Sequence, residues 1–201
     1  DTIRSLIAKK ILIIGPETAT PLVLDLNGDG VHTTSVQEGV RFDMMGYGLP
    51  VQTGWTDGQD GLLVLDLNHD GVINSGLELF GNGTRLASGN KAADGFAALQ
   101  MHDSNQDGVI NAYDDVFTHL QVWVDRNHDG VSQASELHAL KDVGVQSIAL
   151  NAQASTTMDN GNALSLVSHW TSQDGAQHAL VDVNFTTKET PWTATATHAV
   201  L

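Results

Sequence analysis

The chain of 201 residues has no cysteine, so no disulfide can stabilise it. It also lacks any apolar run approaching the roughly 18–20 residues that are needed to cross a bilayer. The apolar stretch from Ile3 to Ile14 is interrupted by Arg4, Lys9 and Lys10, and no small-residue cleavage site follows it. The sequence therefore predicts neither membrane insertion nor a targeting signal.

Basic residues are scarce as well. Nine Lys and Arg stand against 24 Asp and Glu, which gives a formal net charge of −15. Nucleic acids and anionic membranes are bound by clustered Lys and Arg, so the composition argues against both partners. Half of the acids, 12 of the 24, lie in or beside four short loops. Negative charge gathered in this way needs a counter-charge, for which a metal cation is the obvious candidate.

The common enzyme motifs are missing. Nine histidines are present, but no His-x-x-x-His pair and no cysteine accompany them to form a zinc site. The Gly-x-Ser-x-Gly turn of serine hydrolases is absent too. The sequence thus predicts a protein that is not an enzyme.

Four loops share the pattern Asp-x-Asn-x-Asp-Gly followed by valine, and they begin at Asp25, Asp66, Asp103 and Asp125. A loop of the EF-hand type offers side-chain oxygens at positions 1, 3 and 5 and a main-chain carbonyl at position 7. Glycine at position 6 allows the sharp turn, position 9 often binds through water, and an acid at position 12 closes the cage. Because every donor is an oxygen, the pattern predicts calcium at four or more sites.

The loops differ in how they are closed. The third and fourth loops carry an acid at position 12, whereas the acid of the second loop falls at position 13, which requires a one-residue bulge with Gly76 as the candidate. The first loop has Val36 at position 12, so a distant residue, water or a ligand must complete its cage. Loop by loop, the predicted ligands are Asp25, Asn27, Asp29, Val31 and Thr33; Asp66, Asn68, Asp70, Val72, Asn74 and Glu78; Asp103, Asn105, Asp107, Val109, Asn111 and Asp114; and Asp125, Asn127, Asp129, Val131, Gln133 and Glu136.

An empty loop of this kind opposes folding. Carboxylates about 5 Å apart repel each other by about 3 kcal/mol per pair at an effective dielectric constant near 20. When a cation is bound, its binding free energy adds to the free energy of folding instead. We therefore expect the chain to be loosened or unfolded at low calcium and folded at millimolar calcium.

The predicted fold class is α+β: a single calcium-stabilised domain with several EF-hand-like loops, short helices and a small antiparallel sheet. Apolar periodicity predicts helical segments at 77–80, 92–101 and 134–142. Strands are predicted at 21–25, 61–66, 146–150, 163–170 and 179–185, and residues 114–124 are mixed. The expected organisation is a leader or linker at 1–20, the calcium-binding module at 21–188 and a linker to a next domain at 189–201.

From Pro21 to about Leu150 the chain resembles a family within the large RTX proteins that are exported by type I secretion. The motifs that carry the resemblance are Pro21-Leu-Val-Leu-Asp-Leu-Asn-Gly-Asp-Gly30, Thr53-Gly-Trp55, Asp60-Gly-Leu-Leu-Val-Leu-Asp-Leu-Asn68, Glu78-Leu-Phe-Gly81, Asp94-Gly-Phe96 and Leu120-Gln-Val-Trp-Val-Asp-Arg-Asn-His-Asp-Gly130. The resemblance implies an extracellular, cell-surface location.

One branch of this family is the self-processing module of iron-regulated RTX proteins. It cleaves an Asp-Pro bond at its own N-terminus when calcium binds, and the scissile Asp directly precedes the Pro-Leu-x-Leu-Asp strand. Here Thr20 occupies that position, and the chain contains no Asp-Pro pair. A threonine cannot form the cyclic anhydride through which such a bond breaks, so the resemblance to this branch implies an inactive module.

The other branch is the calcium-dependent peptide-binding domain of giant RTX adhesins, and it supplies the leading expectation. It implies a monomeric module within a larger chain that binds a peptide or protein on a host or neighbouring cell, docking a C-terminal carboxylate. The first loop, which lacks its own closing acid, is the expected docking point, and Met44, Met45, Tyr47 and Trp55 are the expected side-chain pocket. A core position for Trp55, and a purely structural stalk extender, remain alternatives.

Overall fold

The computed structural model describes residues 20–188. The leader or linker expected at 1–20, apart from Thr20, and the linker expected at 189–201 lie outside the described residues. Within the described part, no helix is long and apolar enough to span a membrane.

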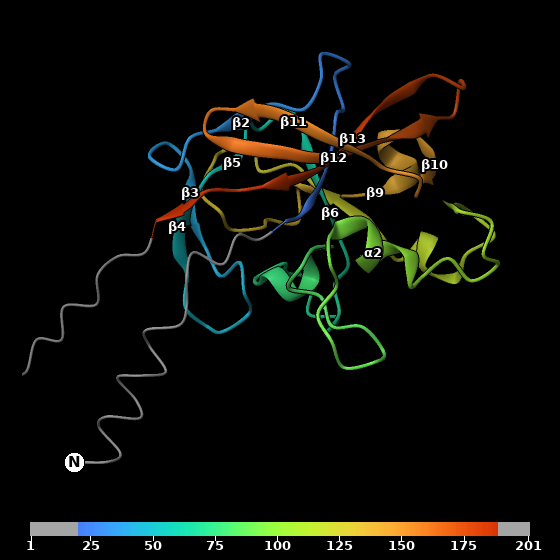
Figure 1. Cartoon of the computed structure of the whole chain (residues 1–201), viewed down its shortest axis with the longest axis horizontal. Coiled ribbons are helices and arrows are strands. Elements are labelled where there is room, and N and C mark those ends of the chain that lie inside the picture. Colours follow the sequence, from blue (N-terminus) through green and yellow to red (C-terminus); the bar gives the residue numbers. More distant parts are fainter. Residues whose placement is uncertain (1–19, 189–201) are drawn as a thin grey trace, which may run out of the picture.

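A nine-stranded sheet organises the molecule, and every strand pair in it is antiparallel. Its strands follow the order β7-β10-β12-β13-β1-β6-β8-β9, with β11 paired to β12. In Figure 1 the long strands β12 and β13 cross the upper part of the molecule, and α2 lies below them. The bounds are β1 Leu22–Leu24, β6 Gly61–Val64, β7 Val109–Ile110, β8 Gln121–Trp123, β9 Leu137–Ala139, β10 Val145–Ala149, β11 Gln153–Asp159, β12 Asn162–Ser172 and β13 Gln177–Asn184.

The remaining elements are short. Two small sheets have the orders β14-β4-β3 and β2-β5, and one α-helix and three 3₁₀ turns complete the described part. Asp94 caps the helix by accepting a hydrogen bond from the Ala97 N–H at 2.8 Å. The bounds are β2 Thr33–Thr34, β3 Val40–Phe42, β4 Val51–Thr53, β5 Trp55–Thr56, β14 Thr187–Lys188, α2 Gly95–Gln100, η1 Gly76–Glu78, η2 Asp115–Thr118 and η3 Leu140–Val143.

The central strands are apolar throughout because both faces of the sheet are covered. In β1, Leu22 and Leu24 belong to one hydrophobic cluster, whereas Val23 belongs to a second cluster on the opposite face. In the neighbouring β6, Leu63 packs into the first cluster and Leu62 into the second. Side chains alternate across a strand, so an uninterrupted apolar run suits a strand that is buried on both sides. Both strands lead into acidic loops, which anchors the loops to the core.

The expected α+β class is wrong, because the described chain is nearly all β, with a curled half-barrel sheet and one short helix. The sheet is large rather than small. Residues 134–142, expected as a helix, contain β9 and the start of η3. Leu137 pairs with Trp123 on β8, and Leu140 is buried in the 3₁₀ turn that follows. An apolar spacing of three fits this strand and turn as well as a helix.

Strand β11 was not predicted. It is largely exposed and has no alternating apolar pattern, and it pairs with β12 through a tight hairpin. The hairpin turn is Asn160-Gly161, with φ of 48° and 86°. Two successive positive φ angles are what an Asn-Gly pair accommodates in a two-residue turn, so this dipeptide is the signal that could have revealed the strand.

Candidate metal sites

The second, third and fourth loops share one internal geometry, which the fourth loop illustrates. Asp125 accepts hydrogen bonds from the Asp129 N–H at 3.2 Å and the Gly130 N–H at 2.9 Å. Asn127 accepts a bond from the Asp129 N–H at 3.2 Å and donates from its amide to the Asp129 carboxylate at 3.0 Å. These bonds gather the oxygens of positions 1, 3 and 5 around a tight turn. The corresponding residues of the other two loops make the same bonds.

The position-4 residues of these loops, His69, Gln106 and His128, have φ between 57° and 59°. These left-handed conformations hold the tight turns. The first loop has Gly28 at that position, with φ of 84°. Its Asp25 accepts bonds from the Gly28 and Gly30 amides, at 2.7 and 3.1 Å.

The closing acids of the third and fourth loops, Asp114 and Glu136, accept the same pair of main-chain hydrogen bonds. Each acid accepts bonds from the N–H groups of positions 2 and 9 of its own loop, and so lies over the turn. The distances are 2.8 Å from Ser104 N and 3.0 Å from Asn111 N to Asp114, and 3.2 Å from Arg126 N and 3.4 Å from Gln133 N to Glu136. Asp114 and Glu136 are both buried, so each brings a desolvated oxygen pair to its loop.

In the second loop, Glu78 occupies the closing place although it stands at position 13. The 3₁₀ turn η1 takes up the additional residue, and a Cβ on Gly76 would come within 1.8 Å of the Met44 carbonyl oxygen. Glu78 Oε2 accepts a bond from the Asn74 N–H at 2.9 Å, whereas the buried Oε1 has no hydrogen-bond partner within residues 20–188. Burial raises the pKa of Glu78, and the nearby charges of Asp66 and Asp70 raise it further. A buried, unpaired oxygen on a side chain that lies near two further acids fits a bound cation.

The fourth loop has a similar orphaned oxygen at position 9. The Gln133 amide nitrogen donates to Asp129 at 2.8 Å, but the buried Gln133 Oε1 has no partner in the described part of the chain. Oxygen is the donor that calcium prefers. The second and fourth loops therefore each contain a buried oxygen atom that a bound cation would satisfy.

The first loop is closed by Asp60, which the sequence did not single out. Asp60 accepts bonds from the Leu26 N–H at 3.3 Å and the His32 N–H at 2.8 Å, at positions 2 and 8 of the loop. This arrangement closely matches the closing acids of the third and fourth loops. The carboxyl is fully buried, and its burial, with lesser contributions from Asp57 and Asp25, raises its pKa to about 7. Asp60 reaches the loop because it directly precedes β6, the sheet neighbour of β1.

Thr33, a predicted ligand of the first loop, forms hydrogen bonds outside that loop. The N–H and the hydroxyl of Thr33 both donate to the Asp159 carboxylate, at 2.6 and 2.8 Å, which ties the loop to the β11–β12 hairpin. The Thr33 hydroxyl oxygen also accepts a bond from the Asn162 amide at 2.9 Å, so this side chain is bonded to the hairpin through both its hydrogen and its oxygen.

We predict that Asp60→Asn lowers the calcium affinity of the first loop by about tenfold or more, because one charged ligand is replaced by a neutral amide. Isothermal titration calorimetry at low salt measures the change. Asp57→Asn is the matched control, since Asp57 lies in the same segment, bonds the Asp60 N–H at 3.2 Å and carries the same charge. Equal effects of the two substitutions would show that overall charge, and not the place of Asp60, determines the affinity.

Indole N–H groups donate hydrogen bonds to oxygens of the first and fourth loops. The buried Trp55 donates from Nε1 to Asp125 Oδ2 at 2.8 Å, and the buried Trp123 donates from Nε1 to Glu136 Oε2 at 3.4 Å. Trp170 donates to the main-chain oxygen of Asp25 at 3.0 Å. The environment of these indoles is therefore coupled directly to the loop oxygens.

The four side chains expected to form a ligand pocket do not lie together on the surface. Met44 and Trp55 are 2% and 0% exposed and belong to the hydrophobic core, where Trp55 packs against Phe42 with ring centroids 5.3 Å apart. Met45 packs against the same cluster and is only partly buried, whereas Tyr47 is 55% exposed. Trp55 thus has the core position that was the alternative interpretation, together with a hydrogen bond to a loop acid.

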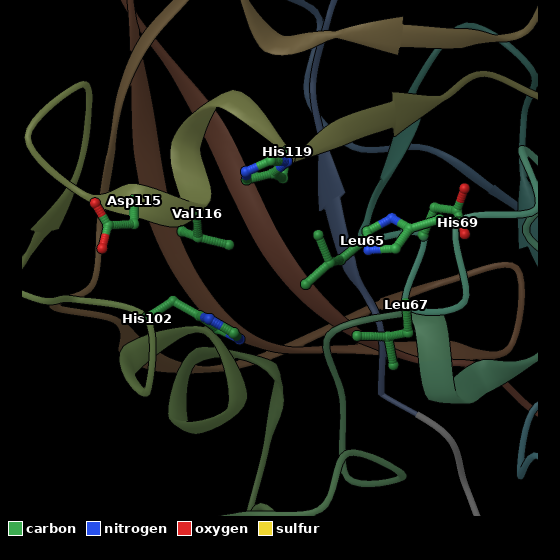
Figure 2. Close-up of a pocket in the computed structure, with 8 residues that line it drawn as sticks. Leu65, Leu67, His69, His102, Asp115, Val116 and His119 are labelled. Carbon is green, nitrogen blue, oxygen red and sulfur yellow. The ribbon is translucent and has the colours of Figure 1, made fainter.

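A concave surface lies elsewhere, between the second loop and the third. It encloses about 400 Å³, and Figure 2 shows its histidine and apolar side chains arranged around a common space, with Asp115 at the edge. The lining residues are Leu65, Asp66, Leu67, His69, His102, Asp115, Val116 and His119. Burial lowers the pKa of His102, which favours its neutral form.

A basic side chain contacts one of the loop acids: His32 Nε2 lies 3.8 Å from Asp29 Oδ1. Within residues 20–188, no three His, Asp or Glu side chains gather tightly enough to form a metal site by themselves. A cation in these loops would therefore also depend on asparagine and main-chain oxygens, as calcium loops do.

Thr20 lies beside a buried acid on β13. Asp182 is 1% exposed and accepts a bond from the Gly95 N–H at 2.6 Å. Its burial, with a smaller contribution from Asp94, raises its pKa to about 7, and a hydrogen-bonding contact with the Thr20 hydroxyl opposes this rise. The Thr20 hydroxyl also accepts a bond from the Asn82 N–H at 3.1 Å. Side chain 20 is therefore held next to a carboxyl that is largely protonated below pH 7.

Asp182 predicts a pH dependence of stability. The folded state retains its proton up to about pH 7, whereas an unfolded Asp releases it near pH 4, so the free energy of unfolding falls as the pH rises between these values. The slope from this group approaches about 1.4 kcal/mol per pH unit. In urea unfolding with calcium, Asp182→Asn should therefore gain stability relative to the native chain between pH 5 and pH 8. If the difference in the free energy of unfolding between the two proteins stayed constant from pH 5 to pH 8, the prediction would be contradicted.

The fold and its loops define a class of antiparallel β module with repeated Asp-x-Asn-x-Asp-Gly turns. The SPM domain family matches residues 22–186, and the chain belongs to this family. Over 166 residues it is 45% identical to the iron-regulated protein FrpA of Neisseria meningitidis serogroup C. The match covers 81% of this chain and 15% of that protein, so the chain corresponds to a small part of its relative. The resemblance to the iron-regulated RTX branch is confirmed, and the resemblance to adhesin domains stays a prediction.

Proposed function

We propose that the chain is a calcium-loaded module of a secreted RTX-type protein, and that its four loops hold the fold together only when Ca²⁺ occupies them. In this proposal the module is exported with low calcium in its loops and becomes rigid at millimolar extracellular calcium. The weaker sites of extracellular modules have affinities in this range. In this proposal the chain does not cleave itself between Thr20 and Pro21, because Thr20 lacks the carboxyl that the reaction requires.

The observation that carries the proposal is the common closure of the four loops. Three local acids and the distant Asp60 each place a buried carboxylate over a turn that already contains two aspartates. In the first and fourth loops the first aspartate, Asp25 or Asp125, is buried as well. Burying carboxylates beside each other is costly unless a cation compensates them. Bound calcium would supply that charge, and the loop oxygens would replace its water shell.

Native mass spectrometry of the chain in calcium tests the proposal. We expect at least four bound ions, one for each loop, and the loss of one ion when the first aspartate of a loop is replaced by alanine. Asp174→Ala is a suitable control, because Asp174 lies in an exposed β12–β13 turn outside the loops. A native chain that retains no calcium would overturn the proposal.

A second candidate function is the binding of a peptide or protein on another cell, and the pocket in Figure 2 favours it. The pocket joins apolar side chains to imidazoles at the border of two loops, so its shape would depend on their calcium. Because Asp60 occupies the closing place of the first loop, this pocket is a better docking candidate than that loop. In a peptide screen, His119→Ala should weaken any calcium-dependent binder, and a screen without binders would exclude this function.

A further inference from the structure

A single buried hydroxyl joins the second loop to the fourth. Ser132 Oγ accepts a hydrogen bond from the Ile73 N–H at 2.7 Å and donates one to the Ile73 carbonyl oxygen at 3.2 Å. Ile73 and Ser132 are 1% and 6% exposed. Each residue occupies position 8 of its loop and follows directly after the position-7 valine, Val72 or Val131.

The contact acts on a peptide unit that faces the second loop. The Ile73 N–H and the Val72 carbonyl belong to one planar trans peptide, so they point in opposite directions. The Val72 carbonyl is the position-7 oxygen that this loop would give to a cation. By binding the N–H on the opposite side of the peptide, Ser132 therefore fixes the orientation of the Val72 carbonyl. A cation on the carbonyl would polarise the same peptide and strengthen its N–H as a donor to Ser132.

The contact depends equally on the fourth loop. Ser132 is bonded directly to Val131, whose carbonyl is the position-7 oxygen of that loop, so a cation in the fourth loop would fix the backbone that carries the hydroxyl. If either loop loosens, the buried N–H and C=O of Ile73 lose their partner. Leaving buried polar groups unpaired destabilises the structure, so the order of each loop depends on the order of the other through this contact.

Both loops also contain a buried oxygen that a bound cation would satisfy. Glu78 Oε1 in the second loop and Gln133 Oε1 in the fourth are buried oxygens without a hydrogen-bond partner within residues 20–188. Glu78 is only 5% exposed and lies near Asp66 and Asp70. The two loops joined by Ser132 are thus the two that contain such an oxygen.

We propose that the second and fourth loops bind calcium cooperatively and that the Ser132 hydroxyl couples them. The inference rests on the proposed function, in which the loops bind Ca²⁺, and adds that two of the sites act as a pair. Coupling between sites is reciprocal, so occupancy of either loop raises the affinity of the other by the same factor.

The test compares the loss of the second site in two backgrounds. Asp70→Ala disables the second loop, and calcium binding to the fourth loop is followed by the fluorescence of Trp55 and Trp123, which donate to Asp125 and Glu136. In the native background we expect Asp70→Ala to lower the fourth-loop affinity by about tenfold, within the usual range of allosteric coupling. In the Ser132→Ala background, the same substitution should lower it less than about twofold.

Two further variants keep the test decisive. If Ser132→Ala does not fold, Ser132→Cys retains the volume with a much weaker hydrogen-bonding group, and the same loss of coupling is expected. Ser168→Ala is the control, since the Ser168 hydroxyl donates to the Ala149 carbonyl at 2.9 Å in another part of the sheet. An equal fall in affinity with and without Ser132 would overturn the coupling and leave calcium binding intact. A native chain that binds no calcium would overturn the proposed function as well.

Discussion

Removal of calcium should unfold the protein at room temperature. Millimolar calcium is about ten times the dissociation constant of a site with a Kd of about 0.1 mM, so each such site stabilises the folded state by about 1.4 kcal/mol and four contribute about 6 kcal/mol. This is comparable with the total stability of about 5–15 kcal/mol that is typical of a domain. With no disulfide to hold the chain and 24 acids against nine basic residues, little remains to compensate the loss.

The near-UV circular dichroism and the fluorescence of the tryptophans test this prediction. Trp55 and Trp123 pack edge to face, with ring centroids 5.3 Å apart, and both donate to acids of the fourth loop. EGTA should therefore abolish the near-UV circular dichroism and shift the indole emission to the red. Calcium should restore both signals, whereas an equal excess of magnesium should restore less, because magnesium demands a stricter octahedral site. A melting temperature that EGTA leaves unchanged would contradict the prediction.

The positions of the acidic loops in the fold could be anticipated from sequence because each loop is a local signal. Oxygen-bearing residues at fixed spacings, a glycine at the turn and an apolar strand before the first aspartate are all read within a dozen residues. The structure accordingly places β1 directly before the first loop, and β6 and β8 one residue before the second and fourth loops. Glu78 reaches the second loop because a short turn, which also depends only on neighbouring residues, takes up the one-residue offset.

The features that were missed depend on contacts between distant segments. Asp60 lies 34 residues from Leu26, and only the pairing of β6 with β1 brings them together. The burial of Met44 and Trp55 also depends on tertiary packing, because a methionine or tryptophan beside glycines suits a surface loop as well as a core. The prediction of the fold class was wrong for a similar reason. Whether Leu137 lies in a helix or a strand is decided by Trp123 on β8, which no local pattern contains.

A self-cleaving module should result from one substitution, Thr20→Asp. With calcium, we expect this variant to divide into residues 1–20 and 21–201, whereas the native chain stays whole. The introduced carboxylate would attack the main-chain carbonyl of its own residue, the bond to the Pro21 nitrogen would break, and that nitrogen would take a proton. Water then opens the resulting anhydride. Buried side chains already confine position 20, and such confinement favours an intramolecular attack.

We expect Asp182 to supply the proton, because it contacts side chain 20 and its pKa is raised to about 7. Adding Asp182→Asn to Thr20→Asp should slow the cleavage by about 100-fold, the lower range for general acid catalysis. Gel electrophoresis and mass spectrometry of the fragments follow the reaction. Thr20→Ser, which retains a hydroxyl but has no carboxyl, should stay intact, as should Thr20→Asp in EGTA. A carboxylate held against its own main-chain carbonyl needs only a proton for the departing nitrogen. A Thr20→Asp protein that folds in calcium but is not cleaved would therefore show that position 20 does not hold the carboxylate in this geometry.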